Sequence, residues 1–192
     1  MRFICFGDSN TYGYDNRSYF GGRYDENTRW PRLLAQMSGG EAVELGENGR
    51  RIPRTEAEIQ NALGSLRRAG PADFLIVLLG GNDLLSDGAE ASAETAAARM
   101  ERFLRRTDEL PELRSAKKVL AAPPPFTRGA WVSSERLISE SRRLAKSYER
   151  LAGRLGCAFL NSGELPLQSD GVHFTEEAHR LLSEKLLPLL KR

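Results

Sequence analysis

The sequence predicts a single α/β domain in which a parallel sheet is covered by helices on both faces. Five short apolar runs alternate with segments of helical periodicity along the whole chain. This alternation is typical of parallel sheets whose strands are joined by helical crossovers. The length of 192 residues suits one domain, and no linker or internal repeat divides residues 1–192.

The five apolar runs are interpreted as strands buried on both faces. They are nearly continuous in apolar residues rather than alternating with polar ones, as strands of a parallel sheet covered by helices should be. The predicted strands are residues 2–6, 41–46, 73–79, 118–122 and 157–160.

Helices are predicted wherever apolar residues recur at helical spacing and capping residues stand at the ends. Thr55 and Glu58 have the spacing of a capping box at the start of the second helix, and Gly156 ends the fourth. The predicted helices cover residues 30–37, about 55–70, 92–106, 134–155 and 175–190.

Composition limits the classes of partner. The chain has 28 basic and 26 acidic residues, a net charge of +2, so we expect no nucleic acid partner. No apolar run approaches the ~20 residues of a membrane span. Cys5 and Cys157 are too few and too far apart for a metal site or a disulfide framework. Since Met1 leads directly into the first strand, we expect no signal peptide and a cytoplasmic location.

Polar and glycine-rich segments follow each predicted strand. In open parallel sheets, ligands bind at the carboxyl ends of the strands, so these segments are where a site is expected. In chain order they read GDSNTYG, ENGRR, GGND, PPPFTRG and NSGELPLQSDGVH.

Two of these segments hold candidates for nucleophilic catalysis. Asp170 precedes His173 by three residues, a spacing that lets a carboxylate hold imidazole Nδ1–H and leave Nε2 free to accept a proton. The hydroxyl of Ser9, after the first strand, is a weak nucleophile without such a base. The alternative is a turn with an incidental histidine. His179, inside the last helix, is expected to have a packed or half-exposed role instead.

Acyl transfer also needs donors aimed at the oxyanion of the tetrahedral intermediate. The candidates are the backbone N–H groups of Ser9 and Gly49 and the side-chain amide of Asn82. Taken singly, Gly49 and Asn82 are also ordinary turn residues. Together, these residues follow different strands of one sheet, where a site is expected.

This set of residues resembles the SGNH, or GDSL-type, hydrolase superfamily. The similarity comprises four blocks in the family's order, GDSNTYG, GENGR, GGND and DGVH, and spans nearly the whole chain. It implies a flavodoxin-like three-layer α/β/α sandwich with a five-stranded parallel sheet. It also implies hydrolysis of small acyl esters through an acyl-serine intermediate, with Ser9, Asp170 and His173 as the triad and without metal or organic cofactor.

A narrower similarity is to the arylesterase and acetyl-xylan-esterase branch, which includes oligomeric acyltransferases. It is carried by CFGDSNTYGYD, GRYDENTRWPRLLAQM and ENGRR, and it favours a homo-oligomer. The chain departs from that branch at 51–53, where Arg-Ile-Pro replaces the usual threonines, and at 83–95, which is short and alanine-rich. Both regions bear on the preferred ester.

Substrate contacts are expected from residues beside the predicted catalytic positions and from one rim segment: Asp8, Asn10, Arg50, Phe126 and Val172. Loops 13–29 and 123–133 carry further aromatic residues, which are expected at the pocket or a subunit interface, with packing on their own domain as the alternative: Tyr14, Tyr19, Phe20, Tyr24 and Trp131. Trp30 is expected in the core.

The favoured function is a serine esterase for small acetyl, short-acyl or aryl esters. Within the enzyme class, the alternatives are a lysophospholipase or thioesterase for longer acyl chains and a deacetylase for carbohydrate O-acetyl groups. A different class is a non-catalytic flavodoxin-like module that holds a phospho-ligand with Ser9, Asn10 and Thr11. Against that module, the chain lacks GxGxxG and GxxxxGK[ST], and Asp8 adds an unfavourable negative charge.

Overall fold

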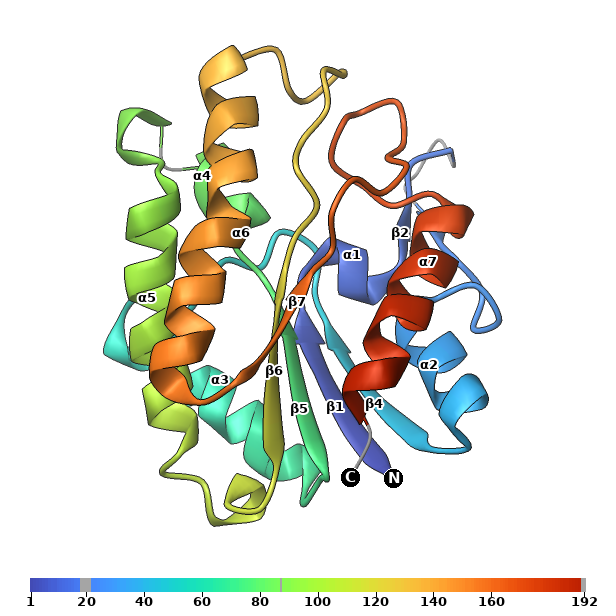
Figure 1. The fold of residues 1–192 in the computed structure, drawn as a ribbon, viewed down its shortest axis with the longest axis vertical. Coiled ribbons are helices and arrows are strands. Elements are labelled where there is room, and N and C mark those ends of the chain that lie inside the picture. Colours follow the sequence, from blue (N-terminus) through green and yellow to red (C-terminus); the bar gives the residue numbers. More distant parts are fainter. Residues whose placement is uncertain (18–21, 87, 191–192) are drawn as a thin grey trace.

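A computed structural model describes residues 1–17, 22–86 and 88–190. Five parallel strands form the central sheet in the order β4-β1-β5-β6-β7 (Figure 1), which is the flavodoxin-like order 2-1-3-4-5. The strands are β1 (Arg2–Gly7), β4 (Glu41–Gly46), β5 (Phe74–Leu78), β6 (Lys117–Ala122) and β7 (Ala158–Asn161). The predicted fold class is confirmed, and each strand lies within a residue or so of its predicted bounds.

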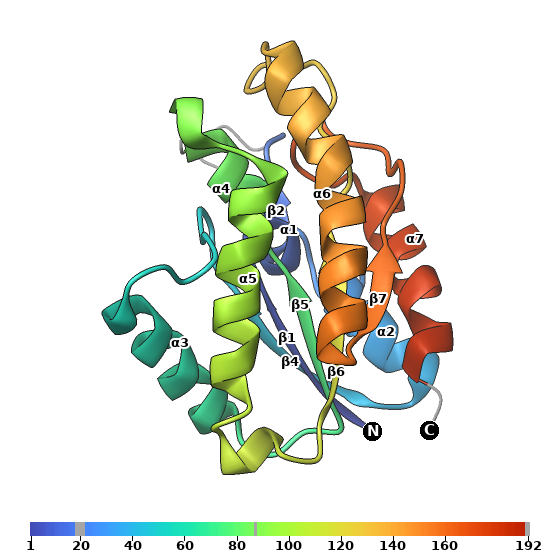
Figure 2. The same cartoon turned by 60° about the vertical axis from the view of Figure 1, so that its left-hand side comes forward.

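Helices cover both faces of this sheet. Figures 1 and 2 show α3, α5 and α6 on one face and α2 and α7 on the other. Their bounds are α2 (Trp30–Ser38), α3 (Glu56–Ala69), α5 (Ala93–Thr107), α6 (Glu135–Leu155) and α7 (Glu176–Leu186). At the start of α3, the Thr55 hydroxyl accepts from the Glu58 N–H at 3.2 Å and Glu58 accepts from the Thr55 N–H at 2.9 Å. The predicted capping box is therefore present.

The sheet separates two hydrophobic cores. Because side chains alternate along a strand, Ile4 and Phe6 of β1 enter the core under α3, α5 and α6. Phe3 and Cys5 enter the core under α2 and α7, where Trp30 is fully buried as predicted. The described helices include none with the length and apolarity needed to cross a membrane.

The last helix differs from its prediction. It is α-helical only to Leu186 and continues as a 3₁₀ turn over Leu187–Leu190. Pro188 has no N–H to donate to the preceding turn, so the α-helical hydrogen-bond pattern is interrupted there.

Several short elements have no counterpart in the sequence prediction. They lie mainly at the carboxyl edge of the sheet, and each is too short to produce a recognisable apolar period. These elements are α1 (Ser9–Tyr12), the antiparallel pair β2 (Tyr14–Asp15) and β3 (Gly22–Arg23), α4 (Gly81–Ser86), and 3₁₀ turns at Gly88–Glu90 and Pro111–Leu113.

Candidate active site

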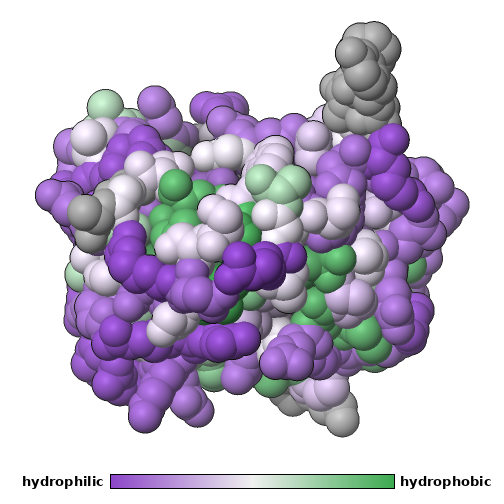
Figure 3. Space-filling model, turned by 90° about the horizontal axis from the view of Figure 1, so that it is seen from above, coloured by the Kyte–Doolittle hydropathy of each residue, from purple (hydrophilic) through white to green (hydrophobic). Residues whose placement is uncertain are grey.

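The candidate site lies at the carboxyl edge of the sheet. Gly7 at the end of β1 is level with Gly46 of β4 and with Leu78 of β5, so the loops after these three strands start side by side. Figure 3, viewed onto this edge, shows small hydrophobic patches set among hydrophilic surface. The register thus brings together the segments that carry Ser9, Gly49 and Asn82.

Ser9 is the first residue of the short helix α1. The Asp8 carboxylate caps this helix, accepting a hydrogen bond from the Asn10 N–H at 3.0 Å. The helix packs so closely on the end of β4 that a Cβ at Gly46 would lie 2.2 Å from the Tyr12 nitrogen. Glycine is required at this position for that approach. Ser9 is only 5% exposed, so this residue is buried below the surface at the carboxyl edge of the sheet.

A continuous hydrogen-bond chain joins Ser9, His173 and Asp170. Imidazole Nε2 of His173 lies 3.0 Å from Ser9 Oγ, and Nδ1 lies 2.8 Å from Asp170 Oδ2. Oδ1 of the same carboxylate accepts the N–H groups of Val172 at 2.8 Å and of His173 at 2.9 Å. Burial alone would raise the pKa of Asp170, but these hydrogen bonds lower it to about 2. The carboxylate is therefore ionised at neutral pH and fixes the orientation of the ring.

Asn10 clamps the loop that carries His173 to the helix that carries Ser9. Its Nδ2 donates to the Val172 carbonyl at 3.2 Å, and its Oδ1 accepts from the Phe174 N–H at 2.9 Å. Both bonds are buried, and both polar atoms of the amide are used. Asn10 thus holds the loop that carries His173 against α1, and Val172 contributes a backbone carbonyl to this contact.

Asn16 and Tyr14 belong to the site, although the sequence argument assigned Asn16 no role. Asn16 Nδ2 donates to Asp170 Oδ2 at 2.5 Å, so the carboxylate is bound from a second side. The Tyr14 ring lies 4.5 Å from the His173 ring, centroid to centroid. Asn16 is identified only by the folded structure, in which its amide contacts the carboxylate of Asp170. Tyr19 and Phe20 of the same loop lie outside the described residues.

Gly49 lies in loop 47–53 and Asn82 lies in α4, and the two segments are hydrogen-bonded to each other. The φ of Gly49 is +74°, in the left-handed region that favours glycine, while a Cβ there would meet no atom within 4 Å. Asn82 Nδ2 donates to the Arg50 carbonyl at 3.0 Å, and the carboxylate of its neighbour Asp83 accepts the Ile52 N–H at 2.9 Å. These two bonds fix loop 47–53 against α4.

Arg50 and Phe126 are engaged with the protein itself. The Arg50 guanidinium donates to the carbonyls of Gly7 and Leu45 and lies 4.3 Å from the centroid of the Phe6 ring. Phe126 is 4% exposed and packs under Gly81. A direct contact of either side chain with a substrate stays a prediction.

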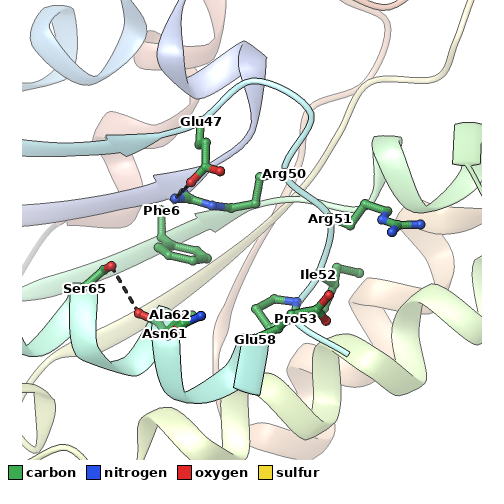
Figure 4. Close-up of a pocket in the computed structure, with 10 residues that line it drawn as sticks. All are labelled: Phe6, Glu47, Arg50, Arg51, Ile52, Pro53, Glu58, Asn61, Ala62 and Ser65. Atoms are coloured by element: carbon green, nitrogen blue, oxygen red, sulfur yellow. Dashed lines mark hydrogen bonds and ion pairs between the residues drawn. The ribbon is translucent and has the colours of Figure 1, made fainter. Parts of the chain in front are cut away.

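A cavity of about 250 Å³ lies between loop 47–53 and α3, with Phe6 of β1 also in its lining (Figure 4). Its lining includes Arg50, Ile52 and Pro53 from the loop and Asn61 and Ser65 from α3. Neither Ser9 nor His173 lines it, so this hollow is separate from the hydrogen-bonded chain.

His179 is fully buried. Its Nδ1 accepts from the Trp30 N–H at 3.3 Å, and its ring meets Phe174 edge-on at 5.3 Å. Burial, with a smaller contribution from the Arg29 charge, lowers the pKa of His179 to about 3. The ring is therefore neutral at physiological pH and acts as a packing residue.

The Asp8 carboxyl group adds a pH-dependent contribution to stability. Burial raises the pKa of Asp8 from 3.8 to about 6, although the Asn10 N–H and the charges of His173 and Arg50 act against the shift. A raised folded-state pKa contributes stability at low pH, and this contribution is lost as the pH rises through about 6.

The Asp8→Asn variant keeps an oxygen to cap α1. We expect its free energy of unfolding, relative to that of the parent, to increase as the pH is raised from 4 to 8. The gain should be about 2–3 kcal/mol, at about 1.4 kcal/mol per unit of pKa shift. Urea unfolding of both proteins at the two pH values measures it. A stability difference that stays constant across this range would contradict the assignment.

Comparison with known proteins identifies the family of this chain. The model of the GDSL-like lipase/acylhydrolase family matches residues 5–181. No curated protein matches the chain significantly. Among solved structures, a carbohydrate acetylesterase family member from Sinorhizobium meliloti is 26% identical, with a TM-score of 0.86 over 98% of this chain and 96% of that chain.

Two further structures have the same architecture. A protein assigned as an arylesterase from Agrobacterium tumefaciens strain C58 is 28% identical, with a TM-score of 0.86 over 98% of this chain and 97% of that one. The aryl esterase of M. smegmatis is 23% identical, with a TM-score of 0.84 over 98% and 97% of the two chains, and supports the fold alone. The chain therefore belongs to the GDSL-like lipase/acylhydrolase family and is a carboxylic ester hydrolase with the SGNH-type α/β fold.

Proposed function

We propose that the protein is a serine esterase for small carboxylic esters, with Ser9 as the nucleophile, His173 as the general base and Asp170 as its orienting carboxylate. The observation that carries the proposal is the chain of hydrogen bonds from Ser9 Oγ to His173 Nε2 and from His173 Nδ1 to Asp170. All three side chains are at most 5% exposed, so the chain of bonds is shielded from competing water. A nucleophile, a base and an orienting group in this order are what acyl transfer requires.

In the first half of the reaction, His173 Nε2 takes the Ser9 proton as Oγ attacks the ester carbonyl. The C–O bond to the alcohol then breaks, and the imidazolium returns the proton to the leaving oxygen. This step leaves an acyl-serine. In the second half, water loses a proton to His173 and attacks the acyl carbon, and the acid departs as Ser9 recovers its proton.

The oxyanion is proposed to sit among the N–H groups of Ser9 and Gly49 and the Asn82 amide. The hydrogen bond from Asn82 to the Arg50 carbonyl, with that from Ile52 to Asp83, holds two of these donors in a fixed relation. Donors held in advance cost no reorganisation when negative charge develops on the carbonyl oxygen.

The preferred acyl group is proposed to be short. One structure above 25% identity is described as a carbohydrate acetylesterase family member, which supports an acetyl group, and another is described as an arylesterase, which supports a small aryl ester. The rival enzyme classes, lysophospholipase and thioesterase, would instead need room for a long acyl chain.

The test is a chain-length series of 4-nitrophenyl esters from acetate to octanoate. We expect kcat/KM to be highest for the acetate and to fall steadily with chain length. Pretreatment with an alkyl fluorophosphonate should abolish turnover of every ester and add one phosphonyl group to the peptide that contains Ser9. A maximum at the octanoate would overturn the short-acyl assignment, and a label on another residue would overturn the nucleophile.

A further inference from the structure

An exposed indole stands beside the imidazole of the proposed triad. Trp131 is 55% exposed, and its ring lies 4.9 Å from the His173 ring at an interplanar angle of 80°. The other large apolar side chains that are well exposed among the described residues are Met1 and Met37. Met1 precedes β1 and Met37 lies near the end of α2, just before β4, so both are at the opposite edge of the sheet. Among the described residues, Trp131 is thus the large, well-exposed apolar side chain that lies at the carboxyl edge of the sheet, beside the candidate site.

The backbone holds Trp131 firmly against the loop that carries the triad. The Trp131 N–H donates to the Asp170 carbonyl at 3.0 Å, and the Ala130 N–H donates to the Ser169 carbonyl at 3.1 Å. The two segments are so close that a Cβ at Gly129 would lie 2.5 Å from the Asp170 carbonyl carbon. Val132, the next residue, is fully buried and anchors the turn. The backbone from which the indole extends is therefore fixed against the loop that carries His173.

The chemistry assigns this position to the alcohol part of the ester. In the tetrahedral intermediate the oxyanion points to the donors at Gly49 and Asn82. The leaving oxygen must lie next to His173 Nε2, because that nitrogen returns the proton. A side chain that contacts the imidazole therefore borders the alcohol rather than the acyl group.

We propose that Trp131 is a stacking platform for a leaving alcohol that carries a ring, either an aryl group or the apolar face of a pyranose. This inference rests on the proposed esterase function and adds the alcohol subsite to it. A flat, half-exposed indole offers a large apolar surface and loses little side-chain conformational entropy when a ligand binds. It packs best against flat apolar faces. Tyr14, on the neighbouring loop, contacts the same imidazole at 4.5 Å and adds a second aromatic group to this subsite.

The kinetic test compares Trp131→Ala and Trp131→Phe with the parent protein on three acetates: phenyl acetate, an O-acetylated methyl pyranoside and ethyl acetate. Using the ratio of kcat/KM for a ring-bearing ester to that for ethyl acetate cancels any general effect on the triad. We expect Trp131→Ala to lower this ratio about tenfold, mainly through KM, because a stacking contact is lost. Trp131→Phe keeps a ring and should stay within about threefold of the parent ratio.

Met37→Ala is the matched control, since it removes an exposed apolar side chain from the opposite edge. Its ratio should equal that of the parent. A fall confined to phenyl acetate identifies an aryl alcohol as the ligand, and a fall confined to the acetylated pyranoside identifies a sugar. Equal losses on all three esters would mean that Trp131 only shields His173, and that result overturns the platform.

A binding measurement separates failure of this inference from failure of the esterase mechanism. In the Ser9→Ala variant, acrylamide should quench the exposed Trp131 and spare the buried Trp30. We expect phenol or methyl glucopyranoside to protect the quenchable indole, and we expect no such protection when Trp131→Phe is added. Absence of protection in a protein whose turnover depends on Ser9 overturns the platform alone. Full turnover by Ser9→Ala overturns the mechanism itself.

Discussion

Ser9→Ala is expected to lower kcat for hydrolysis of 4-nitrophenyl acetate by about 10⁴-fold or more, because the variant has no oxygen to attack the carbonyl. The residual rate would come from the oxyanion donors and from substrate binding, both of which the substitution leaves in place. Initial rates under substrate saturation, corrected for spontaneous hydrolysis, measure the change. The fold should survive, since the side chain of Ser9 makes one hydrogen bond among the described residues, the contact of its hydroxyl with His173.

Ser65→Ala is the matched control for this experiment. Ser65 lies on α3, lines the cavity beside loop 47–53 and donates its hydroxyl to the Asn61 carbonyl. Its substitution removes one serine hydroxyl outside the proposed site and should leave kcat within about twofold of the parent. Equal rates for Ser9→Ala and the parent protein would reject Ser9 as the nucleophile.

Asn82→Ala is expected to lower kcat by about 10²–10³-fold while changing KM little, because the amide is proposed to bind the oxyanion more strongly than the ground-state carbonyl. The same amide donates to the Arg50 carbonyl, so the variant also loses one hydrogen bond that orders loop 47–53. That loss should cost about 1 kcal/mol of unfolding free energy. Steady-state kinetics and urea unfolding measure the two effects separately.

Two controls test whether the loss belongs to the oxyanion or to loop order. Asn61→Ala removes an amide from the neighbouring helix and should retain parental kcat. The rate at which an alkyl fluorophosphonate inactivates the protein should fall in Asn82→Ala, since its phosphoryl oxygen needs the same donors. A kcat within about threefold of the parent would show that Asn82 does not stabilise the transition state.

The sheet and its main helices could be predicted from the sequence because their signals are local. The run from Phe74 to Leu78 is apolar at every position, and the strand it predicts is buried on both faces. Thr55 and Glu58 predict the start of α3 because both groups of a capping box lie within one turn. These patterns depend on near neighbours, and the structure confirms them.

The short elements at the carboxyl edge could not be predicted, because the hydrogen bonds that hold them in place come from residues far away in the sequence. Asn16 is bonded to Asp170, 154 residues away, and Asn10 bonds the carbonyl of Val172, 162 residues away. No pattern of spacing along the chain predicts such hydrogen-bonded pairs. The same is true of Trp131, whose sequence context leaves open whether its indole is buried or lies beside an imidazole.

The sequence by itself determined the fold class, the order of the strands along the chain and the identity of the chemically capable residues, because apolar periodicity, caps and residue type are properties of short segments. Only the tertiary structure decided which of those residues meet. The 3.0 Å contact between Ser9 and His173 arises because parallel pairing places the ends of β1, β4 and β5 at one level and a buried amide, Asn10, then bonds the last loop to the first. Such contacts form only when the chain closes on itself, since the energy that fixes them comes from groups far apart in sequence.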